Sequence, residues 1–288
     1  MPQSPRRSLL FVPGAEPRRI EKSMDAGADM IIFDLEDSVS PEKKDMARKL
    51  VIEALHQNFG QTELAVRINA AGTPFHEEDI ALMVQAGCKT LMIPKSHSIE
   101  SLEKISQLIS HFEQNEATTR FLALIETPLG VLNVSQLCMS SKRIDVLCFG
   151  HADFCMEMGL THMDASSGVV FHARCQIALT AKAYQKTAID NVCLAVKDES
   201  AFRKDVEIGM NLGYEGKLCI HPSQVKIANE VFTPTAEQIE YAQQVLAGWQ
   251  DAQAHGAGVF SLNNKMIDAP VVAAQERILD RAKQSGLL

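Results

Sequence analysis

Short apolar runs alternate along the chain with longer amphipathic segments, and nearly every run ends abruptly at a polar or charged cluster. Strands buried on both faces of a parallel sheet read as such continuous runs, and chemistry in parallel α/β folds gathers where the strands end. Eight runs fit this description, at residues 9–12, 31–33, 64–66, 91–93, 122–125, 146–149, 192–196 and 218–220. The pattern predicts eight buried parallel strands whose carboxyl ends form the candidate site.

The segments between the runs carry signals of helix starts. A capping residue or a proline suited to the first helical turn occurs at Pro17, Ser40-Pro41, Thr73-Pro74 and Thr127-Pro128. The runs recur at intervals of roughly 20–45 residues, as βα units require. We therefore expect a closed (β/α)8 TIM barrel of the α/β class. An open doubly wound sheet is the alternative. No Gly-x-Gly-x-x-Gly turn follows the first run, which argues against dinucleotide binding.

The chain continues well beyond the eighth run. Residues 1–224 are expected to form the barrel, as the catalytic domain, and residues 225–288 a C-terminal helical extension. A helix is expected from Thr235 to Ala254, followed by a glycine-containing break at residues 255–258 and a final helix to Leu288. The glycine hinge predicts either a lid that contacts a neighbouring subunit or a plain surface excursion.

Composition narrows the class of protein. A net charge of −8 argues against a nucleic-acid partner, because phosphate backbones require clustered basic residues. Seven cysteines without a C-x-x-C pair indicate a reduced protein with no disulfide framework. No apolar run approaches the length of a membrane span or signal-peptide core. The sequence therefore predicts a cytoplasmic protein without a membrane partner.

Glu126 and Asp153 follow the fifth and sixth runs, which are neighbours in a barrel. Two carboxylates at this position can ligate Mg2+, with water and substrate oxygens completing the octahedron. The alternative is that they cap the helices that follow, which suits Asp153 better than Glu126.

Arg67 ends the third run, and a charged side chain in an apolar strand needs an anionic partner or must face the barrel mouth. It could bind a substrate carboxylate or a developing enolate oxygen. Alternatively, it forms an internal ion pair with Asp34, Glu36 or Asp37 after the second run. These acids would then orient Arg67 or metal-bound water.

Arg18 and Lys22 lie four residues apart in the first helix, where backbone amides also favour phosphate. They form either an anion site or a solvated basic face. His151, His172 and His221 do not have zinc-ligand spacing, so we interpret them as positioning or packing groups.

Six motifs occur in order along the chain: Arg7-Ser8-Leu9-Leu10-Phe11-Val12-Pro13-Gly14, Asp34-Leu35-Glu36-Asp37-Ser38-Val39, Val66-Arg67-Ile68-Asn69, Ile125-Glu126-Thr127, Phe149-Gly150-His151-Ala152-Asp153 and Cys219-Ile220-His221-Pro222-Ser223-Gln224. Together they resemble the HpcH/HpaI aldolase and citrate lyase beta-subunit family. The resemblance runs from about residue 6 to 275 and is closest to the malyl-CoA and citramalyl-CoA lyases.

The resemblance implies a Mg2+-dependent lyase that reversibly cleaves a 3-hydroxyacyl-CoA thioester to acetyl-CoA and a small 2-oxo acid, glyoxylate or pyruvate. It also implies a homo-oligomer, a trimer or hexamer. In these lyases the acid/base aspartate reaches a neighbouring subunit's site, which requires at least a dimer. The residues it assigns are Glu126 and Asp153 for metal, Arg67 for substrate, Arg18 and Lys22 for CoA phosphates, Phe11, Ile220 and His221 for the thioester, and Asp268 for acid/base chemistry.

The sequence departs from the family pattern at two places. The metal motif usually reads Gly-Ala-Glu-Asp-Leu but here reads Gly-His-Ala-Asp-Phe from Gly150, and Ala195 replaces an acid common in relatives. Both changes bear on the identity of the substrate. Two other functions stay open: a CoA-independent pyruvate aldolase of the same family, and a citrate lyase beta subunit or non-catalytic CoA-binding subunit of a larger complex.

Overall fold

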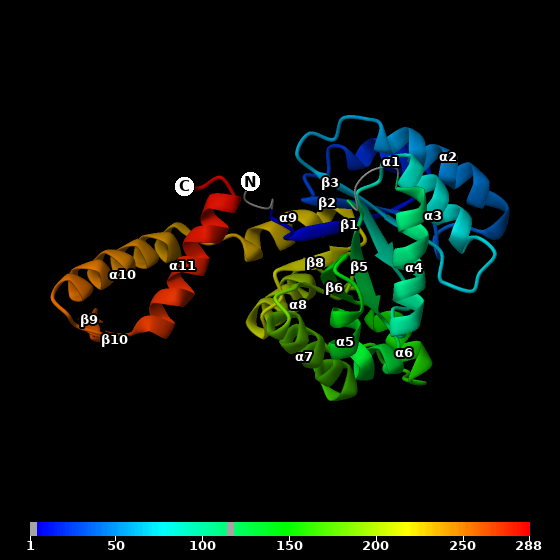
Figure 1. The fold of residues 1–288 in the computed structure, drawn as a ribbon. Coiled ribbons are helices and arrows are strands. Elements are labelled where there is room, and N and C mark those ends of the chain that lie inside the picture. The colour runs from blue at the N-terminus through cyan, green and yellow to red at the C-terminus, as the bar shows by residue number, and fades with distance from the viewer. Residues whose placement is uncertain (1–4, 114–117) are drawn as a thin grey trace. The chain divides into compact units, whose positions relative to one another are not determined.

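The computed structural model describes residues 5–113 and 118–288, and its central feature is a closed barrel of eight parallel strands (Figure 1). The strands follow one another around the barrel in chain order, and the last pairs with the first through Ser8 and Lys217. The expected (β/α)8 barrel is therefore confirmed. The strands are β1 (Ser8–Pro13), β2 (Met30–Asp34), β3 (Glu63–Arg67), β4 (Thr90–Ile93), β5 (Arg120–Ile125), β6 (Ile144–Phe149), β7 (Thr187–Asp190) and β8 (Gly216–Cys219).

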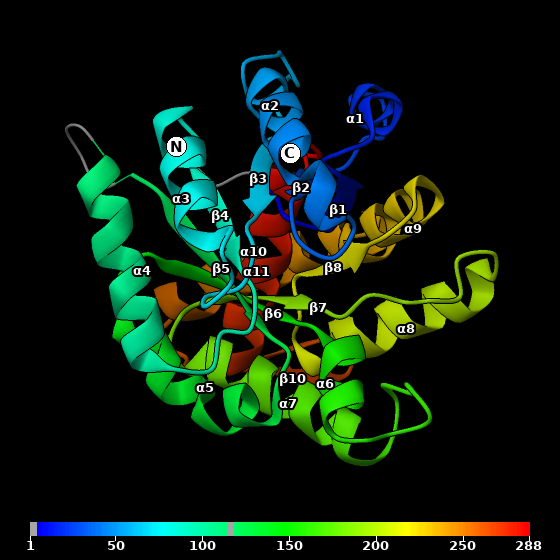
Figure 2. The same ribbon diagram turned by 90° about the vertical axis from the view of Figure 1, so that its right-hand side faces the viewer.

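Helices surround the barrel: in Figure 2 the strands lie in the middle of this unit and the helices lie around them. Thr127 caps its helix as expected, because its hydroxyl accepts a hydrogen bond from the Gly130 amide at 2.9 Å. The helix expected at Pro41 begins with a 3-10 turn, η1 (Pro41–Lys43). The helices are α1 (Pro17–Ser23), α2 (Lys44–Leu55), α3 (His76–Gln85), α4 (Ile99–Phe112), α5 (Pro128–Ser140), α6 (His151–Glu157), α7 (Gly168–Ala183), α8 (Glu199–Leu212) and α9 (Pro222–Phe232).

Apolar side chains fill both sides of the strands. In β2, Ile32 packs in a central cluster with residues from the other strands, while its neighbours Ile31 and Phe33 are equally inaccessible to solvent. Alternate residues of a strand point to opposite faces, so burial of both faces produces the continuous apolar runs. The central cluster contains Leu9, Met30, Ile32, Ala65, Met92, Leu122, Leu124, Val146, Cys148, Ile189 and Leu218.

The predicted position of the seventh strand is wrong. The sequence favoured residues 192–196, but β7 is Thr187–Asp190 and residues 192–196 form the loop that follows. The strand includes a fully buried carboxylate, Asp190, whose charge is compensated by Arg174 and Lys217. Pairing from distant positions makes this charge tolerable, so the strand does not read as an apolar run.

The chain divides into two compact units, the barrel unit Arg6–Asn229 and a second unit that contains Glu230–Leu288. The second unit consists of α10 (Ala236–Ala254), a hairpin of β9 (Phe260–Leu262) and β10 (Lys265–Ile267), and α11 (Ala269–Gln284). Val245, Ile267 and Val272 form its small core. The hairpin was not predicted; its turn places Asn263 and Asn264 at φ 50° and 60°, as a two-residue hairpin loop requires.

No helix within the described residues combines the length and apolar character needed to cross a membrane. The seven cysteines are all free, and the burial of Cys88 raises the pKa of its thiol to about 12. Such a thiol stays protonated and acts as a small apolar side chain.

Candidate active site

A cavity of about 660 Å3 opens at the carboxyl ends of the barrel strands. It brings together the exits of β1, β2, β3 and β8 and the loop after β7, as parallel α/β barrels arrange their sites. Its lining includes Phe11, Arg19, Lys22, Asp34, Asp37, Arg67, Val192, Ile220 and His221. Most residues that the sequence assigned to substrate binding therefore face one space.

Arg67 is held at this cavity by an ion pair that uses two guanidinium nitrogens. Its Nε and Nη2 both donate to the Asp34 carboxylate at 2.7 Å, and its Nη1 lies 3.2 Å from Glu36 and Asp37. The ring of Phe11 lies 5.0 Å from the guanidinium carbon. The internal ion pairs considered in the sequence are thus present, and Arg67 lines the cavity at the same time.

Asp34 is itself firmly oriented. Its two carboxylate oxygens also accept hydrogen bonds from the amides of Glu36 and Ser38. Burial by itself would raise the pKa of Asp34, but the Arg67 charge and the hydrogen bonds that Asp34 accepts from Arg67, Ser38 and Glu36 together outweigh burial and lower the pKa below its ordinary value. Asp34 therefore stays ionised and fixes the direction of the Arg67 fork.

Glu126 follows β5 and is 2% exposed. Its Oε1 accepts a hydrogen bond from the Lys95 amide at 2.7 Å, and Lys95 has a left-handed φ of 47°. Opposite it lies Gly150, where an added Cβ would stand only 2.5 Å from the Glu126 Cβ, so a larger residue would displace the carboxylate. Burial, followed by the charge of Glu36, raises the pKa of Glu126 to about 8.

Asp153 lies in the first turn of α6, and burial followed by the charge of Asp37 raises its pKa. Burial likewise raises the pKa of Glu36 to about 7. Burial and neighbouring acids therefore raise the pKa of three carboxyls at the mouth, Glu36, Glu126 and Asp153, whereas the pKa of Asp34 is lowered. No group of three or more His, Cys, Asp or Glu side chains suited to a metal ion occurs among the described residues. Glu126 and Asp153 instead offer two oxygen donors, which suits Mg2+ that keeps water or substrate ligands.

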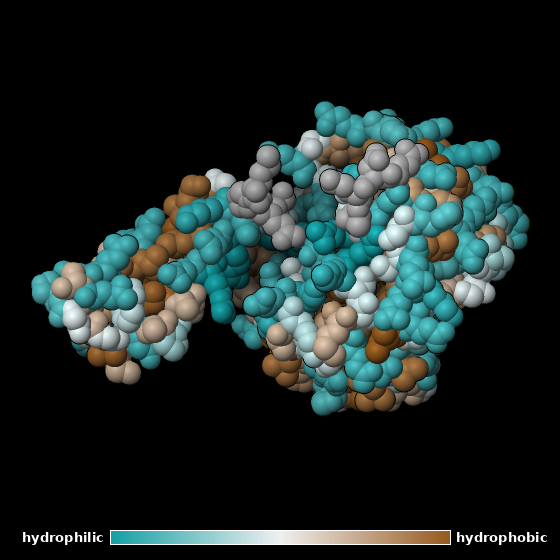
Figure 3. Space-filling model, in the orientation of Figure 1, coloured by the Kyte–Doolittle hydropathy of each residue, from teal (hydrophilic) through white to brown (hydrophobic). Residues whose placement is uncertain are grey.

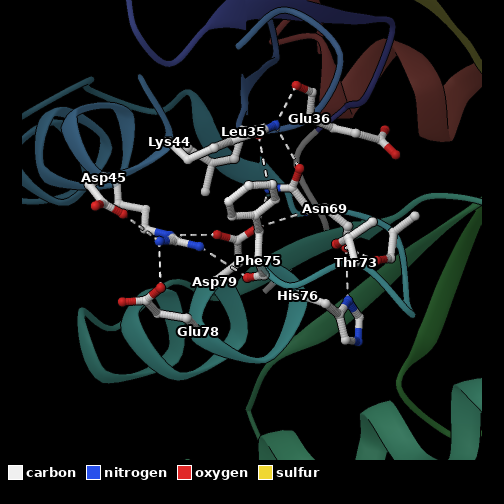
Figure 4. Close-up of polar contacts among 12 residues, drawn as sticks. Leu35, Glu36, Lys44, Asp45, Asn69, Thr73, Phe75, His76, Glu78 and Asp79 are labelled. Atoms are coloured by element: carbon white, nitrogen blue, oxygen red, sulfur yellow. Dashed lines mark hydrogen bonds and ion pairs between the residues drawn. The ribbon is translucent and has the colours of Figure 1, made fainter. Parts of the chain in front are cut away.

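Lys44 connects the backbone after β2 to Asn69, which follows β3 (Figure 4). Its ammonium donates to the carbonyls of Leu35 and Glu36 at 2.6 and 2.8 Å and to Asn69 Oδ1 at 2.6 Å, and Lys44 is 5% exposed. Asn69 in turn donates to Asp79, which accepts from Arg48 at 2.8 Å. The network ties the exits of β2 and β3 to α2 and α3, and so sets the backbone that carries Glu36.

Lys44→Met is expected to reduce the free energy of unfolding by about 2–4 kcal/mol, because three buried acceptors lose their common donor. Denaturant titration measures the change. Lys43→Met is the matched control, since Lys43 is adjacent but exposed, and it should alter stability by less than about 0.5 kcal/mol. Equal effects of the two variants would contradict the role of the network.

The first helix does not place the expected basic pair on the cavity. Lys22 lines it together with Arg19, three residues earlier, whereas Arg18 is exposed and does not line it. Arg19, Lys44 and Lys95 were not predicted as site residues. For Arg19 the i, i+3 spacing to Lys22 was a usable signal.

Asp268 belongs to the second unit, where it is the N-cap of α11. Its Oδ1 accepts a hydrogen bond from the Val271 amide at 3.2 Å. A capping role is thus present in the structure, and any acid/base role would come in addition to it.

The chain is similar to known proteins over nearly its whole length. Residues 7–222 match the sequence model of the HpcH/HpaI aldolase/citrate lyase family. The chain is 36% identical over 288 residues to the citrate lyase subunit beta of Leuconostoc mesenteroides subsp. cremoris, covering 98% of this chain and 95% of that protein. It is 32% identical over 292 residues to the mitochondrial citramalyl-CoA lyase of Rattus norvegicus, covering 96% and 86%.

A solved structure is similar over the whole chain. The protein CitE from Mycobacterium tuberculosis, in complex with magnesium, acetoacetate and coenzyme A, superposes with a TM-score of 0.82 at 26% identity. The match covers 98% of this chain and 100% of CitE.

Proposed function

Since this chain belongs to the HpcH/HpaI aldolase/citrate lyase family and is a carbon–carbon lyase, we propose that it cleaves, or forms, a 3-hydroxyacyl-CoA thioester with the help of Mg2+. The substrate would be malyl-CoA, citramalyl-CoA or a close relative, and the products acetyl-CoA and a 2-oxo acid. The observation that carries the proposal is the group of carboxyls around Glu126, whose pKa is raised by burial and by the charge of Glu36. Beside them lies the Arg67 guanidinium, which Asp34 holds in place through two hydrogen bonds.

Glu126 and Asp153 would hold the metal. When bound, the metal would act as a Lewis acid that polarises the oxygens of the short acid. Arg67 would stabilise the thioester enolate that receives the electron pair when the carbon–carbon bond breaks. Asp34 and Phe11 keep the guanidinium in place for this purpose. Glu126 is 2% exposed, so the interaction of its carboxylate with a cation is stronger than it would be in water.

The carrier end of the thioester is anionic, and we place it near Lys22 and Arg19 at the edge of the cavity, with Phe11, Ile220 and His221 along the thioester. Arg18 does not line the cavity, and we propose that it attracts the CoA phosphates by its charge from a greater distance. We also propose a cytoplasmic location, in keeping with seven cysteines that form no disulfide among the described residues.

The second unit is proposed to act in a neighbouring subunit of a homo-oligomer, where Asp268 would return a proton to the enolate carbon. Residues 1–224 would then be the catalytic domain, and residues 225–288 the extension that completes the partner's site. Exposed apolar side chains on α5 and α7 support association: Leu132, Met139 and Leu179 are 75%, 66% and 72% exposed. Figure 3 shows apolar surface at the lower edge of the barrel unit, where these helices lie in Figure 1.

Asp268→Asn is expected to lower kcat by about 100-fold or more, because general acid–base catalysis contributes on the order of 10²–10⁴. Asparagine is as good an N-cap as aspartate, so the Val271 hydrogen bond and the melting temperature should be retained. Steady-state kinetics and thermal unfolding together separate the two roles. An active Asp268→Asn variant with unchanged kcat would remove the acid/base assignment.

A mass-spectrometric screen of hydroxyacyl-CoA thioesters with Mg2+ tests the function. We expect acetyl-CoA and an oxo acid from at least one thioester. Cleavage of the free hydroxy acids, insensitive to Arg19→Ala and Lys22→Ala, would instead identify a CoA-independent aldolase. CoA binding without turnover of any thioester would identify a subunit of a larger complex.

A further inference from the structure

A second cavity of about 390 Å3 lies beside the candidate active site. Its walls come from the start of α6, the loop between α6 and α7, the loop after β7, and α8. Among the described residues, Val192 alone lines both cavities, and neither Arg67 nor the two metal carboxylates line the second one. The second cavity is therefore a separate space that adjoins the barrel mouth.

Among the described residues, two that line this cavity each carry a buried side-chain atom without a hydrogen-bond partner. In the described part of the chain, four buried side-chain nitrogen or oxygen atoms are unpaired, and two of them, His151 Nδ1 and Asn191 Oδ1, belong to residues of this one wall. His151 is 3% exposed and Asn191 is 1% exposed. Buried polar groups are normally paired, so their coincidence at one cavity indicates a missing partner.

The orientation of the Asn191 amide defines what the partner must supply. Its Nδ2 donates to the Val192 carbonyl at 2.7 Å. A carbonyl can only accept, so the amide cannot be turned around without placing two acceptors against each other. The unpaired atom is therefore an acceptor, and it requires an N–H or O–H group. The imidazole of His151 is less restrictive, because its tautomers allow either donation or acceptance.

The charges around the cavity are already matched with one another. Asp205 lines the cavity, but it accepts from Lys217 at 2.5 Å and pairs with Arg174 at 3.0 Å. Arg174 and Lys217 also share the buried Asp190. Burial of a further unpaired charge would be costly, so the cavity favours a neutral molecule. Lys204 and Asp164 also line it, but both are exposed and water screens their charges.

Hydrogen bonds from the same ionic cluster also hold the walls of the cavity in place. Arg174 donates through Nη1 to the carbonyl of Ala165 at 3.0 Å and through Nη2 to that of Asp205 at 2.9 Å, which joins the α6–α7 loop to α8. Gln224 donates to the Cys193 carbonyl at 2.9 Å and so holds the loop after β7. Three walls are thus fixed before any ligand arrives, which reduces the entropic cost of binding.

We propose that this cavity binds a small neutral organic molecule that carries an alcohol or a carboxamide. Its O–H or N–H would be donated to Asn191 Oδ1, a second polar atom would pair with His151, and its apolar part would lie against Met163 and Ile208. The proposal goes beyond the lyase reaction and does not depend on it.

The test uses three probes that share an isopropyl group, isobutyramide, 2-methyl-1-propanol and isobutyrate, with the full chain in the absence of thioester and Mg2+; the amide and the carboxylate have the same shape. Protein-observed NMR titration gives each dissociation constant. We expect isobutyramide or the alcohol to bind at least ten times more tightly than isobutyrate, and the stronger of the two identifies the group. Asn191→Leu should weaken this binding at least tenfold, whereas Asn58→Leu, an exposed position, should not.

Ala195→Phe provides a second variant at an exposed lining position, and it should block the cavity without disturbing the core. The proposal is overturned if isobutyrate binds as tightly as the neutral probes, or if folded Asn191→Leu and Ala195→Phe proteins both retain wild-type affinity. It is also overturned if a crystal soaked with the probes shows only ordered water beside Asn191. None of these results bears on the lyase proposal, since no substrate is present.

Discussion

Replacement of Arg67 by lysine is expected to lower kcat/KM for the cleaved thioester by about 100- to 1,000-fold, although the positive charge is kept. Removal of one preorganised donor to a developing oxyanion costs about this much. The Nε and Nη2 atoms of the guanidinium donate to Asp34, and the remaining nitrogen, Nη1, points toward Glu36. An ammonium can hold Asp34 or stabilise the enolate oxygen, but its single nitrogen cannot reproduce the fork.

Steady-state kinetics of Arg67→Lys should show the loss mainly in kcat, because the interaction strengthens as the enolate forms. Arg120→Lys is the matched control: Arg120 is exposed at the start of β5, and its variant should keep wild-type kinetics. A loss of less than about threefold in Arg67→Lys would mean that Arg67 serves only the ion pair with Asp34.

The fold could be predicted because burial of both strand faces leaves a direct trace in the sequence. The seventh strand escaped this rule since its Asp190 is neutralised by Arg174 and Lys217, which are 16 and 27 residues away. The hydrophobic pattern of a few neighbouring residues cannot reveal an ion-pair partner that lies this far away along the chain. The hairpin at Asn263 and Asn264 was missed for a different reason: its strands are only three residues long and too short to show alternation.

The candidate site was predictable where a side chain ends a strand, and not where the backbone acts. Glu126 and Arg67 stand directly at strand exits, so their place at the carboxyl rim of the barrel follows from barrel geometry. The Lys95 amide that binds Glu126 has no sequence signature, because every residue except proline carries one. Arg19 was missed because the short helix α1 places Arg19, rather than Arg18, on the cavity side with Lys22.

Glu126→Gln is expected to remove turnover and, at the same time, to stabilise the metal-free protein at pH 8. The carboxyl is 2% exposed, and burial raises its pKa from 4.5 to about 8. Between these two values the unfolded chain has released the proton while the folded chain keeps it. Increasing pH therefore favours the unfolded state, and the free energy of unfolding falls by up to about 1.4 kcal/mol per pH unit from this group.

Glutamine cannot ionise, so the variant should lose this slope and exceed the wild type by about 2–4 kcal/mol at pH 8, with little difference near pH 4.5. Denaturant titration across this range, in the presence of a chelator, measures the effect; the exposed Glu103→Gln serves as control. Mg2+ should then stabilise the wild type but not the variant, because it binds the ionised carboxylate. If the variant is no more stable at pH 8, burial does not keep the Glu126 carboxyl protonated; if the variant still responds to Mg2+, Glu126 is not a ligand of the ion. The opposite result would explain why the buried carboxylate is kept: it costs stability in the free protein and becomes favourable only when a cation shares its site.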